Sequence, residues 1–190
     1  MGERRGAMLV ISGPSGSGKS SIVKRLLLDP RVEFSISATT RTPREGEVDG
    51  VDYHFLSKEE FRRRVEGGEF IESAEVHGNL YGTLRRPMQD AIDAGRVYLL
   101  EIDVQGALQL KELGIEAAYV FVAPPRMEDL RQRLEGRGTD APEVIERRLK
   151  KAFDEMEERH RYDHVVVNED LHQAVREVQR IVGLDPVAEA

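Results

Sequence analysis

The stretch Gly13-Pro14-Ser15-Gly16-Ser17-Gly18-Lys19-Ser20 fits the phosphate-loop pattern G-x-x-x-x-G-K-(S/T) with every fixed position filled. A short apolar run over residues 8–12 precedes it, and a helical pattern of apolar residues follows Lys19. This order predicts a strand, a glycine turn and a helix, which is the context that the chemistry requires. In such a loop backbone N–H groups surround the phosphates, Lys19 reaches the β and γ phosphates, and Ser20 can ligate Mg²⁺.

Three later apolar runs predict further strands. They cover residues 97–102, 118–122 and 165–167. None alternates apolar with polar residues, which is typical of strands covered on both faces. The amphipathic segments between them each stop at a glycine, as left-handed helix caps do. These glycines are Gly95, Gly114 and Gly183. The pattern predicts an α/β fold: a P-loop NTPase core whose parallel sheet is flanked by helices.

Two stretches interrupt this alternation. Residues 34–84 contain short runs at 35–37, 53–55 and 70–72 that often alternate apolar with polar residues, which predicts a small mixed β insertion. One helix is expected inside it, because Ser57 and Glu60 form a capping-box pattern.

Residues 126–163 are charged, rich in arginine and helical in pattern, with a break at Gly136-Arg137-Gly138. Four residues of this stretch are expected on one buried face. They are Ile145, Leu149, Phe153 and Met156. The expected organisation is a core of residues 1–33, 85–125 and 164–190, the insertion 34–84, and a helical lid 126–163.

The composition excludes several classes of protein. The 190 residues include 28 Lys and Arg against 35 Asp and Glu, a formal net charge of −7. This balance argues against a protein held on nucleic acid or on an anionic membrane by its overall field. No cysteine is present, which excludes disulfides and a thiolate nucleophile. The first residues lack the apolar stretch of a secretory signal, so a cytoplasmic location is expected. The oligomeric state stays open.

A phosphate loop alone does not separate kinases from GTPases. The segment Asp103-Val104-Gln105-Gly106 matches the D-x-x-G string found in GTPases. Guanine recognition in that class normally uses an N-K-x-D string after a later strand. The corresponding segment here reads Val167-Asn168-Glu169-Asp170 and lacks the lysine, which disfavours a GTPase.

An ordered set of motifs closely resembles guanylate kinase over about residues 8–183. The motifs are SATTRTPR at 37–44, Gly46-Glu47, GVDY at 50–53, FIE at 70–72, GNLYGT at 78–83 and EIDVQG at 101–106. The resemblance implies in-line phosphoryl transfer from MgATP to GMP, giving ADP and GDP. Two alternatives are a related kinase with another phosphorylated acceptor, and a guanylate-kinase-like module that only binds proteins. Glu72 with Ser37 favours guanine, and the presence of Lys19 and Ser20 favours an enzyme.

The resemblance also implies a GMP site in the insertion. Arg41 and Arg44, with the hydroxyls of Tyr53 and Tyr81, would hold the GMP phosphate, because the planar fork of arginine suits bidentate contacts. Glu72 would accept hydrogen bonds from guanine N1–H and the exocyclic amine. The remaining implied GMP-binding residues are Ser37, Thr83, Glu101 and Asp103. The family often has Asp where this chain has Glu101, which makes Asp103 the preferred contact for guanine or for metal-bound water.

The ATP side combines the phosphate loop with the lid. The implied ATP-binding residues are Gly13, Pro14, Ser15, Gly16, Ser17, Gly18, Lys19, Ser20, Ser21, Arg133, Arg137 and Asn168. Arg133, Arg137 and Arg148 match the family's lid arginines, and Asn168 would contact the adenine edge or only form a turn. The expected catalytic residues are Lys19, Arg41, Arg137 and Arg148, with Mg²⁺ as cofactor and Ser20 as its ligand. No general base is expected, because the second pKa of a phosphate acceptor is about 6.

Overall fold

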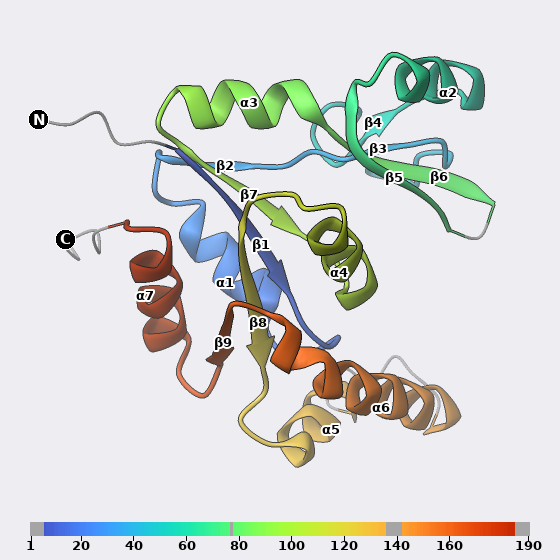
Figure 1. Cartoon of the computed structure of the whole chain (residues 1–190). Coiled ribbons are helices and arrows are strands. Elements are labelled where there is room, and N and C mark those ends of the chain that lie inside the picture. Colours follow the sequence, from blue (N-terminus) through green and yellow to red (C-terminus); the bar gives the residue numbers. More distant parts are fainter. Residues whose placement is uncertain (1–5, 77, 136–141, 185–190) are drawn as a thin grey trace, which may run out of the picture.

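The computed structural model describes residues 6–76, 78–135 and 142–184. Its larger sheet has five parallel strands in the order β2-β7-β1-β8-β9 (Figure 1). These strands are β1 (Ala7–Ser12), β2 (Val32–Phe34), β7 (Val97–Glu101), β8 (Ala118–Ala123) and β9 (His164–Val167). The phosphate loop leaves β1, the central strand. The predicted α/β fold with a parallel sheet is therefore confirmed.

Helices cover both faces of this sheet. Helices α1 (Lys19–Leu26) and α7 (Leu171–Ile181) pack against one face, and α3 (Arg85–Asp93) and α4 (Val104–Glu112) against the other (Figure 1). Along β1, Leu9 and Ile11 point to the first face while Met8 and Val10 point to the second, as the two-residue period of a strand requires. Since both faces are buried, the strand is apolar from Ala7 to Ile11, and only its last residue, Ser12, is polar.

The predicted mixed β insertion forms a second sheet of four strands, in the order β4-β3-β6-β5. These strands are β3 (Ala38–Thr39), β4 (His54–Phe55), β5 (Phe70–Val76) and β6 (Asn79–Leu84). The pair β3 and β4 is parallel, and the other pairs are antiparallel. Helix α2 (Lys58–Glu66) packs on this sheet through Phe61, whose ring stacks on Phe70 with centroids 4.4 Å apart. The predicted cap is confirmed, because Ser57 Oγ accepts a hydrogen bond from the Glu60 N–H at 3.0 Å.

Two expectations around residue 34 are wrong. The expected insertion begins one residue too early, because Phe34 pairs with Leu99 in the larger sheet. Phe34 belongs to β2, a strand that the sequence does not predict because three residues are too few to show a period. The expected strand at 35–37 is absent in this described segment, and β3 begins at Ala38. The reason is that the N–H of Ser35 still bonds to the carbonyl of Leu99, so the chain leaves the larger sheet only after this residue.

The stretch predicted to form a lid contains α5 (Met127–Glu135), α6 (Pro142–Glu157) and a short 3-10 helix, η1 (Glu158–Arg161). Its buried contacts come from Leu130 of α5 and from three residues of α6. These three are Ile145, Leu149 and Ala152. The prediction for Phe153 is wrong, because its side chain is 58% exposed. Phe153 lies about 80° around the helix from Ile145, whereas Ala152 lies about 20° from it. The expected break at Gly136-Arg137-Gly138 lies outside the described residues.

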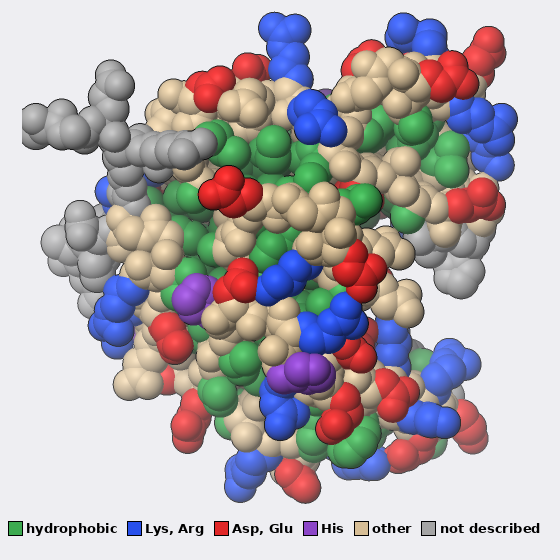
Figure 2. Space-filling model, viewed as in Figure 1, with side chains coloured by type: hydrophobic (Ala, Val, Ile, Leu, Met, Phe, Trp, Pro, Cys, Tyr) green, Lys and Arg blue, Asp and Glu red, His purple; other side chains and the backbone are tan. Residues whose placement is uncertain are grey.

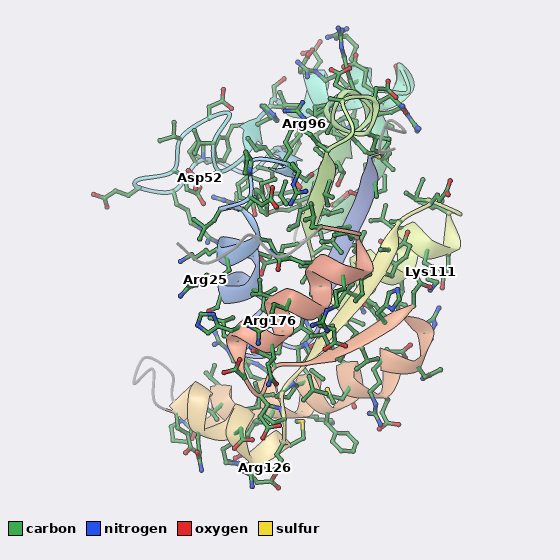
Figure 3. All side chains as sticks on the ribbon, turned by 90° about the vertical axis from the view of Figure 1, so that its left-hand side faces the viewer. Arg25, Asp52, Arg96, Lys111, Arg126 and Arg176 are labelled. Atoms are coloured by element: carbon green, nitrogen blue, oxygen red, sulfur yellow. The ribbon has the colours of Figure 1, made fainter. Side chains whose placement is uncertain are left out.

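The second sheet and the lid helices lie at opposite ends of one side of the molecule, and Figure 2 shows the surface hollowed between them. In Figure 3, Asp52 marks the outer loop of the second sheet and Arg126 the start of the lid. Parallel strands carry ligand-binding residues at their carboxyl ends, which here meet at one edge of the larger sheet. In the part of the chain that the structure describes, no helix is both long and apolar enough to cross a membrane.

Candidate active site

The phosphate loop depends on glycine at three positions, because Gly13, Gly16 and Gly18 all have a positive φ. Gly13 has φ +136°, and a Cβ built on it would lie 2.3 Å from the carbonyl oxygen of Val122 on the adjacent strand. Gly18 caps α1 in the left-handed conformation with φ +95°. It provides no side-chain cap, and the first turn of α1 carries no acidic residue. The positive end of the helix dipole is therefore open to an anion.

Lys19 folds back over this loop. Its Nζ donates to the carbonyls of Gly13 at 2.6 Å and Pro14 at 2.8 Å. These bonds use two of the three donors of the ammonium group. Burial lowers the pKa of Lys19, while the nearby carboxylates of Glu101, Glu155 and Asp103 act in the opposite direction. The side chain is thus a partly desolvated cation beside the start of α1, where phosphates would bind.

A cavity of about 480 Å³ opens on this loop. Its lining includes Glu101, the last residue of β7, Asp103 just after that strand, and Lys151 and Glu155 of α6. Ser20 Oγ donates to Glu101 Oε1 at 2.8 Å, so the expected metal ligand contacts the end of β7. Asp103 Oδ1 accepts the N–H of Gly106 at 2.8 Å, so the D-x-x-G string forms the N-cap of α4.

Sequence reasoning missed Lys151 and Glu155. They form an ion pair at 3.5 Å, four residues apart on α6, and the Glu155 side chain is only 13% exposed. Burial raises the pKa of Glu155. In sequence such a pair is indistinguishable from a solvated i,i+4 pair. Only the packing of α6 over the phosphate loop shows that it lines the cavity.

Asn168 contacts the phosphate loop although it lies 151 residues further along the chain than Ser17. It follows β9, is 6% exposed, and donates through Nδ2 to the carbonyl of Ser17 at 2.8 Å. Its own N–H bonds to the carbonyl of Ala123 at 2.9 Å. In this structure the amide therefore contacts the loop itself rather than only forming a turn.

Asn168→Asp is expected to destabilise the protein by about 1–3 kcal/mol, because a buried carbonyl loses its donor and faces a second acceptor. We also expect a higher KM for ATP, since the loop loses its anchor. Urea unfolding and steady-state kinetics measure the two effects, with the exposed neighbour Glu169→Gln as control. Unchanged stability together with unchanged KM for ATP would show that the bond anchors nothing.

The predicted guanine-reading residues meet in the second sheet. Glu72 and Thr83 are cross-strand partners on β5 and β6, and Thr83 Oγ1 donates to Glu72 Oε1 at 2.8 Å. Thr83 is buried. Burial raises the pKa of Glu72, and the hydrogen bonds from Thr83 partly oppose this. A carboxylate has about four lone-pair positions, so Glu72 keeps acceptor capacity for a ligand.

The raised pKa of Glu72 predicts a stability change in the ligand-free protein. A carboxyl group whose pKa in the folded protein lies above its usual value of 4.5 stabilises the fold at pH values below 4.5. This contribution is lost as the pH rises through the pKa of the folded state. At pH 7 ligand-free Glu72→Gln should therefore melt at a higher temperature than the parent, and near pH 4 this advantage should vanish. Thermal unfolding at both pH values tests this, with the exposed Glu75→Gln on the same strand as control. An advantage of equal size at both pH values would contradict it.

The predicted phosphate-binding residues are partly assembled. The Arg41 guanidinium carbon lies 5.5 Å from the centre of the Tyr53 ring, and this ring meets Tyr81 edge-on with centroids 6.3 Å apart. Arg44 is exposed on the same loop. Ser37 is half-buried, and its carbonyl accepts the N–H of His54 at 2.9 Å.

The lid residues are described only in part. Arg148 lies half-buried in α6, and Arg133 lies in α5. Arg137 lies outside the described residues. The remaining predicted residues of the phosphate loop lie at the start of α1 or in the turn before it. These are Ser15, Gly16, Ser17 and Ser21.

Comparisons with known proteins agree with this geometry. A family model described as "Guanylate kinase" matches residues 5–184. A guanylate kinase of Clostridium perfringens is 46% identical over 181 residues, covering 95% of this chain and 84% of the relative. One from Bartonella henselae is 47% identical over 180 residues, covering 94% and 81%. The crystal structure of guanylate kinase from Anaplasma phagocytophilum matches with a TM-score of 0.71 at 38% identity, covering 95% and 86%.

Proposed function

The chain belongs to the guanylate kinase family and phosphorylates GMP from ATP, and from this premise we propose which residues carry each part of the reaction. The core (1–33, 85–125 and 164–190) binds the ATP phosphates on its phosphate loop. The insertion (34–84) binds GMP, and the lid (126–163) closes over the reacting phosphates. One arrangement carries this proposal: a complete phosphate loop at the carboxyl edge of a parallel sheet, beside a second sheet that holds the Glu72–Thr83 pair.

On the ATP side, the N–H groups at the start of α1 and the Lys19 ammonium neutralise the phosphates. Lys19 exchanges its bonds to the Gly13 and Pro14 carbonyls for phosphate oxygens. This exchange is favourable because a phosphate oxygen carries negative charge, so the ammonium gains an attraction between opposite charges that a neutral carbonyl does not offer. Asn168 keeps the loop in place through Ser17. The complete loop supports catalysis over the protein-binding alternative.

Mg²⁺ is proposed to accompany ATP. Among the described residues no group of three or more His, Cys, Asp or Glu could hold a metal ion. In phosphate-loop sites Mg²⁺ takes few protein ligands and is bound largely by substrate phosphates and water. The Ser20 hydroxyl, already bonded to Glu101, would be the protein ligand, with Asp103 near its water shell. When bound, the ion would supply positive charge that offsets the negative charge developing on the phosphates.

On the GMP side, Glu72 reads the guanine edge through N1–H and the exocyclic amine, with Thr83, Ser37 and Asp103 completing the base site. Arg41, Arg44, Tyr53 and Tyr81 hold the phosphate. This phosphate attacks the γ phosphorus of ATP in line. It needs no base, because it is already largely ionised at neutral pH. Catalysis then consists of positioning and charge neutralisation.

The lid supplies charge late in the cycle. Arg133, Arg137 and Arg148 are proposed to reach the phosphates on closure, which also excludes the water that would hydrolyse ATP. Lys151 already lines the cavity and adds a cation on the same helix as Arg148. The proposed location is the cytoplasm, where both nucleotide substrates are available.

A coupled assay of ADP formation over a panel of nucleoside monophosphates tests the proposed base site. The expected kcat/KM for GMP exceeds that for AMP by about 10⁴, because a buried acceptor built for two donors is left unpaired by adenine. A kcat/KM for AMP or UMP within tenfold of the value for GMP would contradict the assignment of the GMP site to the insertion.

A further inference from the structure

The motif Gly46-Glu47 has no part in the function proposed so far, yet Glu47 bridges both arginines of the phosphate site. Its Oε1 accepts a hydrogen bond from Arg41 Nη2 at 2.8 Å. Its Oε2 accepts the backbone N–H of Arg44 at 2.7 Å. One carboxylate thus joins the side chain of one arginine to the main chain of the other.

The Arg41–Glu47 pair is shielded from water, since the two side chains are only 15% and 19% exposed. Arg41 Nη1 also donates to the Thr42 carbonyl at 2.8 Å, and the guanidinium lies over the Tyr53 ring. The pKa of Glu47 is lowered by the Arg41 guanidinium, so this carboxyl is charged at neutral pH. An arginine that is free to rotate loses much entropy on binding a ligand, whereas this one is already held in a single geometry.

The loop around the pair closes on itself. The N–H of Glu47 donates to the Arg44 carbonyl at 3.1 Å, and the turn passes through Gly46 at φ +86°, a conformation that favours glycine. A carboxylate beside an anion site weakens the attraction of that site for phosphate. The presence of Glu47 therefore requires another contribution to phosphate binding that offsets this repulsion. Arg41 has five donors, and its bonds to Glu47, Thr42 and the Tyr81 side chain do not use all of them, which leaves donors for a ligand.

We propose that Glu47 is a positioning residue for the GMP phosphate. It holds the Arg41 guanidinium and the Arg44 main chain in their phosphate-binding arrangement before GMP arrives. Binding then does not have to order them. This inference rests on the proposed assignment of Arg41 to the GMP phosphate.

Glu47→Gln tests this role, because it keeps the size of the side chain but removes its charge and one acceptor oxygen. We expect the KM for GMP to rise about tenfold, while kcat changes less than threefold and the KM for ATP stays constant. Guanosine, which has the base and sugar without the phosphate, should keep its inhibition constant within twofold. Glu45→Gln, an exposed charge on the same loop, is the matched control and should change neither value.

A double-mutant cycle with Arg41→Lys identifies the partner. Arg41→Lys alone should raise the KM for GMP, and in that background Glu47→Gln should add less than threefold. Glu47→Asp keeps the charge on a shorter arm that cannot span both arginines, so its KM for GMP should be intermediate. Circular dichroism checks that each variant is folded, and Glu47→Asp carries the test if Glu47→Gln is not.

Several outcomes would overturn the inference. A lower KM for GMP in Glu47→Gln would mean that the carboxylate competes with the phosphate. If Glu47→Gln weakened guanosine binding as much as it raises the KM for GMP, the substitution would have a general effect on the loop. The same would follow if Glu45→Gln raised the KM for GMP by the same factor. If Arg41→Lys raises the KM for GMP as expected but Glu47→Gln leaves this KM unchanged, only the proposed role of Glu47 would be overturned. An Arg41→Lys variant with unchanged KM for GMP would overturn both that role and the assignment of Arg41.

Discussion

Lys19→Met is expected to lower turnover by a factor of about 10² or more while the chain stays folded. Lys19 is the cation at the open end of α1, and its present partners are two carbonyls of the loop itself. Methionine has a similar length and apolar character along its stem but carries no charge. It therefore cannot stabilise the negative charge that shifts toward the β–γ bridge during transfer.

Lys24→Met is the matched control, because Lys24 is exposed in the last turn of the same helix. It removes the same charge and should leave turnover within twofold. Steady-state kinetics at saturating ATP and GMP, with circular dichroism for folding, give the comparison. A folded Lys19→Met variant with near-normal turnover would show that the phosphate loop does not act through this charge.

Glu72→Gln should lower kcat/KM for GMP by at least about 10², which corresponds to about 2.7 kcal/mol of transition-state binding. The substitution keeps the size of the side chain but turns one acceptor oxygen into a donor. Because Thr83 already donates to Oε1, the remaining acceptor positions are those that guanine needs. The same variant should be more stable without ligand at pH 7, so loss of activity would not reflect unfolding.

IMP lacks the exocyclic amine and should lose less from Glu72→Gln than GMP does, since only one of the two contacts is available to it. Glu75→Gln changes an exposed glutamate of β5 and should affect neither substrate. If Glu72→Gln lowered kcat/KM for GMP and for IMP by the same factor, Glu72 would not be reading the amine. That contact would then be reassigned to Asp103.

The parts of the site that the sequence predicts well are local. The phosphate loop is a contiguous string whose glycines are required by its own backbone, and the capping box at Ser57 spans a single turn. The proposed guanine-reading pair could be predicted only through the resemblance, because Glu72 and Thr83 meet through the register of two strands. Neither residue type is unusual in a strand.

Contacts between distant segments could not be predicted. The bond from Asn168 to Ser17 joins positions 151 residues apart. Glu155 enters the cavity because α6 packs over the phosphate loop, and its spacing from Lys151 is also that of a solvated pair. Phe153 was misplaced because a helical face was assigned from hydrophobicity, whereas the smaller Ala152 fits the close contact with Leu130 and its neighbours.

We propose that the second sheet reads guanine while the phosphate loop holds ATP. A crystal structure with GMP and a non-hydrolysable ATP analogue tests it most directly. We expect guanine N1–H and the exocyclic amine within about 2.7–3.2 Å of the Glu72 carboxylate, the GMP phosphate on Arg41, and the ATP phosphates on Lys19. Guanine bound away from Glu72, or ATP phosphates away from the start of α1, would contradict it.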